Sequence, residues 1–227
     1  MLSIRSRCWL CRQPLSLMRH GICSCCLRHL PASPPCCPRC GLPAGRTQTP
    51  CGRCLQRPPP WQRLVFVGDY VAPLSQLVKR FKFHRAPELA PALARLMLLR
   101  WQQARREQYL NRPDLILAVP LHASRCWRRG YNQSDLLARP LARWLGCPYR
   151  PAALRRVRKT ALQQRLSAGA RRRNLQRAFV CTVSVAGRHI ALVDDVVTTG
   201  STVAEIAALL RRQGAASVQI WCVCRTL

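Results

Sequence analysis

Residues 190–202 read IALVDDVVTTGST, and this stretch decides the fold. Its four leading apolar residues are typical of a short strand buried on both faces. After the loop, residues 203–213 (VAEIAALLRRQ) have helical periodicity and stop at Gly214, and residues 217–223 form a second apolar run. The order strand, loop, helix, strand predicts an α/β fold with a mostly parallel central sheet flanked by helices.

The loop between strand and helix has the composition of a phosphate site. Gly200 lets backbone N–H groups approach an anion, and the hydroxyls of Thr198, Thr199, Ser201 and Thr202 surround it. The following helix turns its positive end toward the same point. The loop therefore predicts a phosphate cradle.

The two acids before the loop, Asp194 and Asp195, lie where ligands bind in open α/β sheets. Carboxylates repel phosphate, but they accept hydrogen bonds from sugar hydroxyls or hold a divalent cation. A phosphate, a diol and a metal together describe a ribose 5-phosphate that carries pyrophosphate. The alternative is a purely structural strand–turn–helix with an aspartate or serine cap, which paired acids at a buried strand end disfavour.

These residues resemble the phosphoribosyl-pyrophosphate (PRPP) signature of type I phosphoribosyltransferases, and that resemblance implies their fold. It also implies that Asp194 and Asp195 bind the ribose hydroxyls and Mg²⁺, and that residues 198–202 bind the 5′-phosphate. Purine-specific members carry an acid at the position of Thr198, so its absence argues against purine salvage.

Composition points to polyanionic partners. The 227 residues include 38 lysines and arginines against 8 acids, for a net charge of +30, and no acid precedes Asp69. Such a field attracts nucleic acid, phosphorylated metabolites or anionic lipid, although a preference for arginine also reflects genome composition. No apolar run is long enough to span a membrane, and the first residues lack the apolar core of a secretory signal. We therefore expect a cytoplasmic protein without a membrane span.

The first quarter of the chain contains four Cys-x-x-Cys pairs: Cys8 and Cys11, Cys23 and Cys26, Cys37 and Cys40, Cys51 and Cys54. Two such pairs complete a tetrahedral zinc site, so eight cysteines predict two structural Zn²⁺ ions. Disulfides and iron–sulfur ligation are the alternatives. Sequential pairing, first with second and third with fourth, is expected, and interleaved pairing is the alternative. Residues 1–57 then form a zinc-ribbon-like module that metal stabilises.

Residues 58–62 form a proline-rich linker, and residues 63–227 form the main domain. Within it, strands are expected over 64–70 and 115–119, and helices over 73–83 and 86–106. Ser134 or Asp135 is expected to cap a further helix that runs to Leu145.

Several basic residues are candidates for holding pyrophosphate. A loop after strand 115–119 would offer Arg128, Arg129 and Gly130, because arginine binds phosphate oxygens bidentately. Lys82 is a further candidate, because related sequences place a lysine near the substrate. Residues 155–179 are arginine-rich without an acid, and they are expected to form a mobile loop that closes over a polyphosphate. The alternative is an exposed basic helix or a nucleic-acid patch.

Nearly the full chain resembles the ComF/GntX group of phosphoribosyltransferase-like proteins, and within it GntX most closely. The shared features are the cysteine pairs, VPL followed by RRGYNQS, an R-x-R-x-T-x-x-Q run, and VDDVVTTGST. The run places Arg156, Arg158, Thr160 and Gln163 in the basic loop. The resemblance implies a role in DNA uptake or in the use of extracellular DNA as a nutrient. Single-stranded DNA and a DNA-uptake or helicase protein are the implied partners.

Three functions remain open from the sequence. The chain transfers the ribosyl group of Mg-PRPP to an unidentified acceptor, or it is a non-catalytic protein that binds single-stranded DNA or a partner. In the third hypothesis it is a regulator that senses PRPP. No general base is apparent in the sequence.

Overall fold

The computed structural model describes residues 7–17, 20–46, 48–121, 130–157 and 178–226. The central sheet has the order β1-β7-β5-β2, formed by Arg63–Asp69, Ser217–Arg225, His189–Val193 and Leu115–Ala118. Every neighbouring pair in this order is parallel, and the two-residue β6 (Val196–Val197) also runs parallel to β7. The expected α/β architecture is confirmed.

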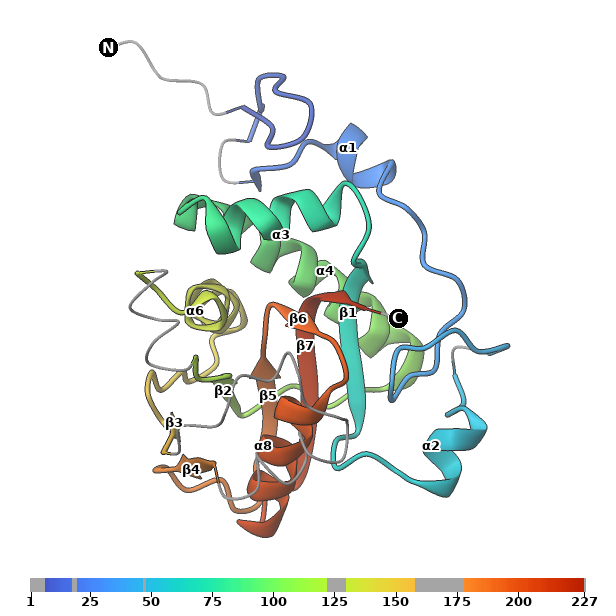
Figure 1. The fold of residues 1–227 in the computed structure, drawn as a ribbon, viewed down its shortest axis with the longest axis vertical. Coiled ribbons are helices and arrows are strands. Elements are labelled where there is room, and N and C mark those ends of the chain that lie inside the picture. The colour runs from blue at the N-terminus through green and yellow to red at the C-terminus, as the bar shows by residue number, and fades with distance from the viewer. Residues whose placement is uncertain (1–6, 18–19, 47, 122–129, 158–177, 227) are drawn as a thin grey trace.

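Helices cover both faces of the sheet (Figure 1). One face packs against α3 (Leu74–Phe83), α4 (Ala90–Gln108) and α6 (Gln133–Leu145). The other face packs against α8 (Ser201–Arg212) and the antiparallel hairpin of β3 (Leu154–Arg156) and β4 (Phe179–Cys181). Alternation along β5 produces this division, since Ala191 and Val193 enter the first core and Ile190 and Leu192 enter the second.

Several element boundaries differ from the expected ones. A 3-10 turn, η2 (Pro87–Leu89), precedes α4, and β7 continues to Arg225, two residues beyond the apolar run. The short β6 and the β3–β4 hairpin were not expected. Pairing with neighbours explains the longer β7, because β1 and β6 continue beside its last residues.

Helix α6 begins earlier than expected. Neither Ser134 nor Asp135 caps it; Asn132 does, and its Oδ1 accepts a hydrogen bond from the N–H of Ser134 at 3.1 Å. The Nδ2 of Asn132 also donates to the carbonyl of Val119, just past β2, at 3.0 Å. This second contact explains why the cap is Asn132, because it ties the start of α6 to the carboxyl end of the sheet.

The two cysteine-rich segments contact different parts of the main domain. Figure 1 shows α1 (Ser24–Arg28) beside α3, whereas α2 (Gly52–Gln56) lies far from α3, toward the other end of the molecule. In the first segment, Gly21 approaches α4 so closely that an added Cβ would lie 2.4 Å from the Cβ of Ala92. In the second segment, the carbonyl of Pro38 accepts a hydrogen bond from the N–H of Leu64 in β1 at 2.9 Å. Each segment is therefore anchored on its own surface.

Among the described residues, no helix combines the length and the apolarity needed to cross a bilayer.

Candidate functional site

Asp194 and Asp195 directly follow β5 at the carboxyl edge of the sheet. The Oδ1 of Asp194 accepts hydrogen bonds from the Oγ of Ser134 at 3.0 Å and from the N–H of Asp195 at 2.8 Å. The Oδ1 of Asp195 lies 3.0 Å from the Nζ of Lys82, which comes from the last turn of α3. Three elements far apart in the sequence thus meet at the acid pair, and Lys82 lies beside it.

The two acids differ in their electrostatic surroundings. Burial, and then the charge of Asp195, raise the pKa of Asp194 to about 7, although Lys82 and Ser134 oppose the increase. Asp195 has the lysine as a direct ion-pair partner. Two ionised carboxylates this close repel each other unless a further cation or a set of hydroxyl donors lies beside them. Mg²⁺ or a ribose diol would supply such partners.

The loop of residues 198–202 follows β6 and opens α8. Gly200 has a φ of 74°, in the left-handed region that favours glycine. The Oγ1 of Thr199 lies 2.9 Å from the Oγ of Ser201 and accepts a weaker hydrogen bond from the N–H of Ser201 at 3.4 Å. Thr198 and Thr199 are exposed, while Ser201 and Thr202 begin the 12-residue helix. The arrangement presents hydroxyls and the positive end of α8 to solvent, as an anion site requires.

Arg225 and Trp61 hold this loop in position. Neither residue was singled out from the sequence. The Nη1 of Arg225 donates to the carbonyl of Val197 at 3.3 Å and to that of Thr198, while its Nε donates to the carbonyl of Cys40 at 2.9 Å. The ring of Trp61 lies 3.4 Å from the position of a Cβ on Gly200. Its Nε1 donates to the carbonyl of Arg39 at 2.7 Å. The loop therefore rests on the second cysteine segment.

The position of Arg225, directly after the apolar stretch 217–224, was the signal in the sequence that its side chain could be buried. A buried guanidinium needs partners, but the sequence does not show which carbonyls supply them.

The pyrophosphate candidates are only partly within the described residues. Arg128, Arg129, Arg158, Thr160 and Gln163 lie outside them. Gly130 is exposed with a φ of 82°, and it directly precedes the segment that caps α6. Arg156 lies in β3, and its guanidinium stands 5.7 Å from the ring centre of Phe179. Lys82 is the member of this group that the structure brings to the acid pair.

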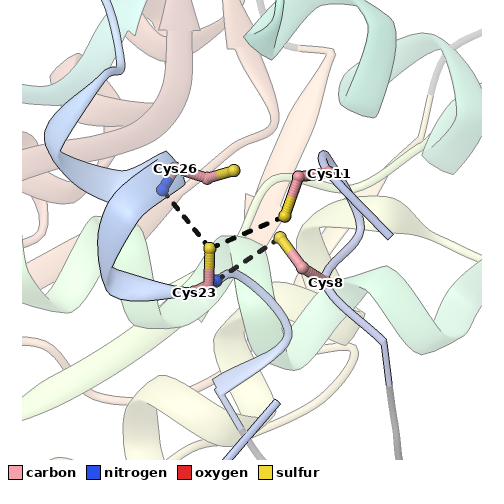
Figure 2. Close-up of side chains that lie close together, drawn as sticks. All are labelled: Cys8, Cys11, Cys23 and Cys26. Atoms are coloured by element: carbon pink, nitrogen blue, oxygen red, sulfur yellow. Dashed lines mark hydrogen bonds between the residues drawn. The ribbon is translucent and has the colours of Figure 1, made fainter. Parts of the chain in front are cut away.

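The eight cysteines of the N-terminal segment form two groups of four. Cys8, Cys11, Cys23 and Cys26 make the first group, whose sulfurs converge in Figure 2; Cys37, Cys40, Cys51 and Cys54 make the second. Within each group the sulfur atoms all lie within 4.8 Å of one another. The structure therefore combines the pairs sequentially, not in the interleaved arrangement.

Both groups suit a tetrahedral metal ion. The Sγ atoms of Cys11 and Cys23 are 3.8 Å apart, and those of Cys40 and Cys51 are also 3.8 Å apart. A Zn–S bond of about 2.3 Å in a tetrahedron gives an S–S separation of about 3.8 Å. Four thiol ligands within this spacing could hold Zn²⁺ in each group.

Backbone donors favour a thiolate at one cysteine of each group, whereas burial raises the pKa of Cys26 and Cys54. Burial raises the pKa of Cys8 and Cys37, but N–H groups outweigh it and lower the pKa to about 6 for Cys8 and about 7 for Cys37. The N–H of Cys23 donates to the sulfur of Cys8 at 3.4 Å, and the N–H of Cys51 donates to that of Cys37 at 3.3 Å. Such donors to sulfur are expected where a thiolate binds a cation.

A groove of about 520 Å³ extends from the phosphate loop toward α2. Its walls combine Thr199, Gly200 and Ser201 with the arginines of the second cysteine segment, Arg53 and Arg57. Pro58, Pro59, Pro60 and Trp61 form its floor together with the first turns of α8. Two arginines and one acid, Glu205, thus line the groove.

Comparison with known proteins places the chain among bacterial relatives of similar length. It is 59% identical to the DNA utilization protein YhgH of Salmonella typhi over 100% of both chains. It is 43% identical to competence protein F of Haemophilus influenzae over 96% of both chains. Residues 132–227 match the model of the phosphoribosyl transferase domain.

Solved structures are more distant. Glutamine PRPP amidotransferase from B. subtilis has a TM-score of 0.40 and 21% identity, covering 63% of this chain and 30% of that one. The family match and the parallel sheet together define a type I phosphoribosyltransferase fold, preceded by two cysteine clusters that could hold zinc.

Proposed function

Because this chain belongs to the ComF family and carries a phosphoribosyltransferase domain, we propose that it binds PRPP together with Mg²⁺. The observation that carries the proposal is the junction of β5 and α8. Two carboxylates follow the strand, and after the two-residue β6 a glycine-centred hydroxyl loop opens the helix. A ribose with a phosphate on one side and a metal-bound pyrophosphate on the other matches these two halves.

The roles of the residues follow from their chemistry. Asp194 and Asp195 accept hydrogen bonds from the ribose hydroxyls and contribute oxygen ligands for Mg²⁺. Residues 198–202 hold the 5′-phosphate. Lys82, at 3.0 Å from Asp195, supplies positive charge for the pyrophosphate. Gly130, Arg156 and the five candidates outside the described residues complete that charge. Bound Mg²⁺ would offset the charge of the pyrophosphate.

We propose further that the protein takes part in the use of DNA, as the names of its relatives say of them. Single-stranded DNA is the proposed partner, with a DNA-uptake or helicase protein as a second. The net charge of +30 supports this, because phosphate contacts supply most of non-specific affinity for DNA. The groove that joins the phosphate loop to Arg53 and Arg57 gives a strand a continuous path.

Two Zn²⁺ ions are proposed for the cysteine groups, where their function is structural. We place the protein in the cytoplasm, because thiolates that hold zinc need a reducing compartment. Neither the acceptor of a ribosyl group nor a general base is evident among the described residues. Binding of PRPP is therefore the primary proposal, and transfer of its ribosyl group is a second step that the same site would support.

The test is calorimetry of the full-length, zinc-loaded protein with PRPP, with and without Mg²⁺. We expect saturable binding that Mg²⁺ strengthens, and we expect Asp195→Asn to weaken it at least about tenfold, since one lost charge-assisted contact is worth about 1.5–3 kcal/mol. Retention of the full affinity by Asp195→Asn would show that the acids have been assigned incorrectly.

DNA binding is measured in the same preparations by fluorescence anisotropy with a labelled single strand. Its affinity should fall steeply with salt and survive Asp195→Asn. Release of pyrophosphate from PRPP would establish turnover. A change in DNA affinity on addition of PRPP, without pyrophosphate release, would instead favour the regulatory hypothesis.

A further inference from the structure

A second hollow lies at the free edge of β1, where the chain between the two cysteine groups crosses the main domain. It has a volume of about 230 Å³. One wall is formed by residues 33–38, the floor by residues 63–66 of β1, and the other wall by Arg100, Gln103, Ala104 and Glu107 of α4. None of these residues belongs to the acid pair or to the phosphate loop. The hollow is therefore separate from the site described above.

Arg63 is the unusual residue in this hollow. Its Nε and Nη1 are buried, and neither has a hydrogen-bond partner within the described part of the chain. Burial lowers the pKa of Arg63 to about 10, and the nearby positive charge of Arg100 acts in the same direction. The carboxylate of Glu107 opposes this shift, but it forms no ion pair with Arg63 among the described residues. Buried donors without partners are costly, so a ligand that satisfies them would be bound favourably.

The second guanidinium in the hollow, that of Arg100, is held in position by two hydrogen bonds. The Nε of Arg100 donates to the carbonyl of Phe66 at 3.3 Å, and its Nη1 donates to the Oε1 of Gln103 at 2.8 Å. The amide of Gln103 in turn donates to Glu107 at 2.9 Å, which directs that carboxylate into a chain of side chains along α4. Two guanidiniums thus share one hollow with one carboxylate, that of Glu107, and with Cys37 of the second cysteine group.

The walls of the hollow strengthen the hydrogen bonds that its two guanidiniums can donate. Pro34, Pro35, Pro38, Leu64 and Phe66 line the hollow with apolar surface. Apolar walls lower the local dielectric constant, so a charge-assisted hydrogen bond is stronger there than on an open surface. Guanidinium groups match the geometry of tetrahedral oxyanions better than ammonium groups do.

We propose that this hollow binds the phosphate of a small phosphorylated molecule, with Arg63 and Arg100 as its ligands. The phosphate oxygens accept the free donors of Arg63, and Glu107 accepts from a hydroxyl of the ligand. Because the hollow joins residues 33–38 to β1 and α4, the bound anion holds the start of the second cysteine segment against the main domain. This site does not depend on the binding of PRPP.

Equilibrium dialysis of the full-length, zinc-loaded protein with inorganic phosphate tests the site at constant ionic strength. The paired variant Thr199→Ala, Ser201→Ala removes hydroxyls from the other phosphate loop, and the remaining saturable site is then measured. In this background, Arg63→Met should weaken phosphate binding at least tenfold. Arg106→Met, an exposed arginine on the same α4, is the matched control and should leave the affinity unchanged.

Folding of the variant is checked by thermal unfolding in phosphate-free buffer. Arg63→Met should unfold at the same or a higher temperature, because it removes a buried charge without a partner. Should it fail to fold, Arg100→Met is tested in its place and is also expected to weaken binding at least fivefold. The proposal is overturned if whichever variant folds binds phosphate as tightly as the parent.

Two further ligands show whether the hollow accepts an organic phosphate and whether it prefers phosphate to a carboxylate. Ribose 5-phosphate should compete with inorganic phosphate at this site, which would show that an organic phosphate is accepted. Acetate at the same concentration should not compete. Equal competition by acetate would overturn the assignment to phosphate, since it would make the hollow a carboxylate site.

Discussion

The guanidinium of Arg225 connects Cys40 to Thr198: its Nε donates to the carbonyl of Cys40 at 2.9 Å, and its Nη1 donates to the carbonyl of Thr198. Cys40 is one of the four cysteines of the second group, and Thr198 begins the phosphate loop. A single buried side chain thus holds both the cysteine segment and the loop in position. We therefore expect the structure of the second cysteine segment to affect the affinity of the loop for phosphate.

Replacing Arg225 should weaken phosphate binding without removing zinc. In Arg225→Met the loop loses its hydrogen bonds to the guanidinium, and we expect PRPP affinity to fall about tenfold, the effect of one or two lost hydrogen bonds to a charged group. Calorimetry measures the affinity, and metal analysis measures zinc. Arg211→Met is the matched control, because Arg211 also donates to backbone carbonyls, those of Ala215 and Ala216, but at the far end of α8. An equal loss in both variants would contradict the specific role of Arg225.

The two cysteine groups should differ in their effect on the site. Cys54→Ser in the second group should lower both zinc content and PRPP affinity, because that group supports the phosphate loop through Cys40 and the carbonyl of Arg39. Cys26→Ser in the first group should lower zinc content and the unfolding temperature but leave PRPP affinity within about twofold in the folded protein. The segment that carries this group packs on α4 through Gly21, which lies against Ala92.

Cys181→Ser is the control for both variants, since Cys181 belongs to neither group. Zinc content is measured by atomic absorption, and stability by thermal unfolding. Equal losses of PRPP affinity in the two cysteine variants would show that the groups act on the loop in the same way.

Lys82 should determine how strongly PRPP binding depends on Mg²⁺. Lys82→Met leaves the charges of Asp194 and Asp195 without their cation, so the pyrophosphate meets more repulsion when Mg²⁺ is absent. We expect the affinity without Mg²⁺ to fall at least tenfold and the affinity with Mg²⁺ to fall less. Lys79→Met, an exposed lysine on the same α3, is the control. A uniform loss with and without Mg²⁺ would assign Lys82 a purely structural role.

Stability should fall as the pH rises toward 7, because of Asp194. Its pKa is raised from 3.8 to about 7 in the folded protein, so the folded state binds more protons than the unfolded state between these values. The free energy of unfolding therefore decreases with increasing pH across this window and levels off above it. Asp194→Asn removes this slope, and at pH 8 it should be more stable than the parent by at least about 1 kcal/mol.

Chemical denaturation at pH 5 and pH 8, without added Mg²⁺, measures the difference between the parent and Asp194→Asn. Glu88→Gln, an exposed acid on η2, serves as the control. A difference between parent and Asp194→Asn that does not change with pH would show that Asp194 is ionised throughout.

Local pattern made much of the fold predictable. The run of residues 190–193, the acids after it and the helix that follows are all defined by side chains within about twenty residues of one another. Strand burial, loop chemistry and helix periodicity act over such distances. For the same reason the eight cysteines were recognisable as ligands, because the Cys-x-x-Cys spacing is itself a local property.

Contacts between distant residues were not predictable in the same way. Nothing near Lys82 in the sequence shows that α3 ends beside Asp195, and 113 residues separate them. The cap of α6 was placed at Ser134 or Asp135, yet Asn132 has the role because it also reaches the carbonyl of Val119. The resemblance suggested Lys82, but only the packing of α3 on the sheet gives it a partner.

The sequence by itself determined the parallel α/β sheet, the acid pair with the hydroxyl loop after it, and the candidate cysteine ligands, because each depends on residues that are neighbours in the chain. Tertiary structure alone decided that the cysteine pairs combine sequentially, that Lys82 faces Asp195, and that Arg225 joins Cys40 to Thr198. It also decided that the Nε and Nη1 of Arg63 are buried without a hydrogen-bond partner in the described part of the chain. The physical reason is that these relationships depend on how strands and helices pack. Packing brings together side chains that are far apart in the chain, and the local sequence does not show which of them will meet.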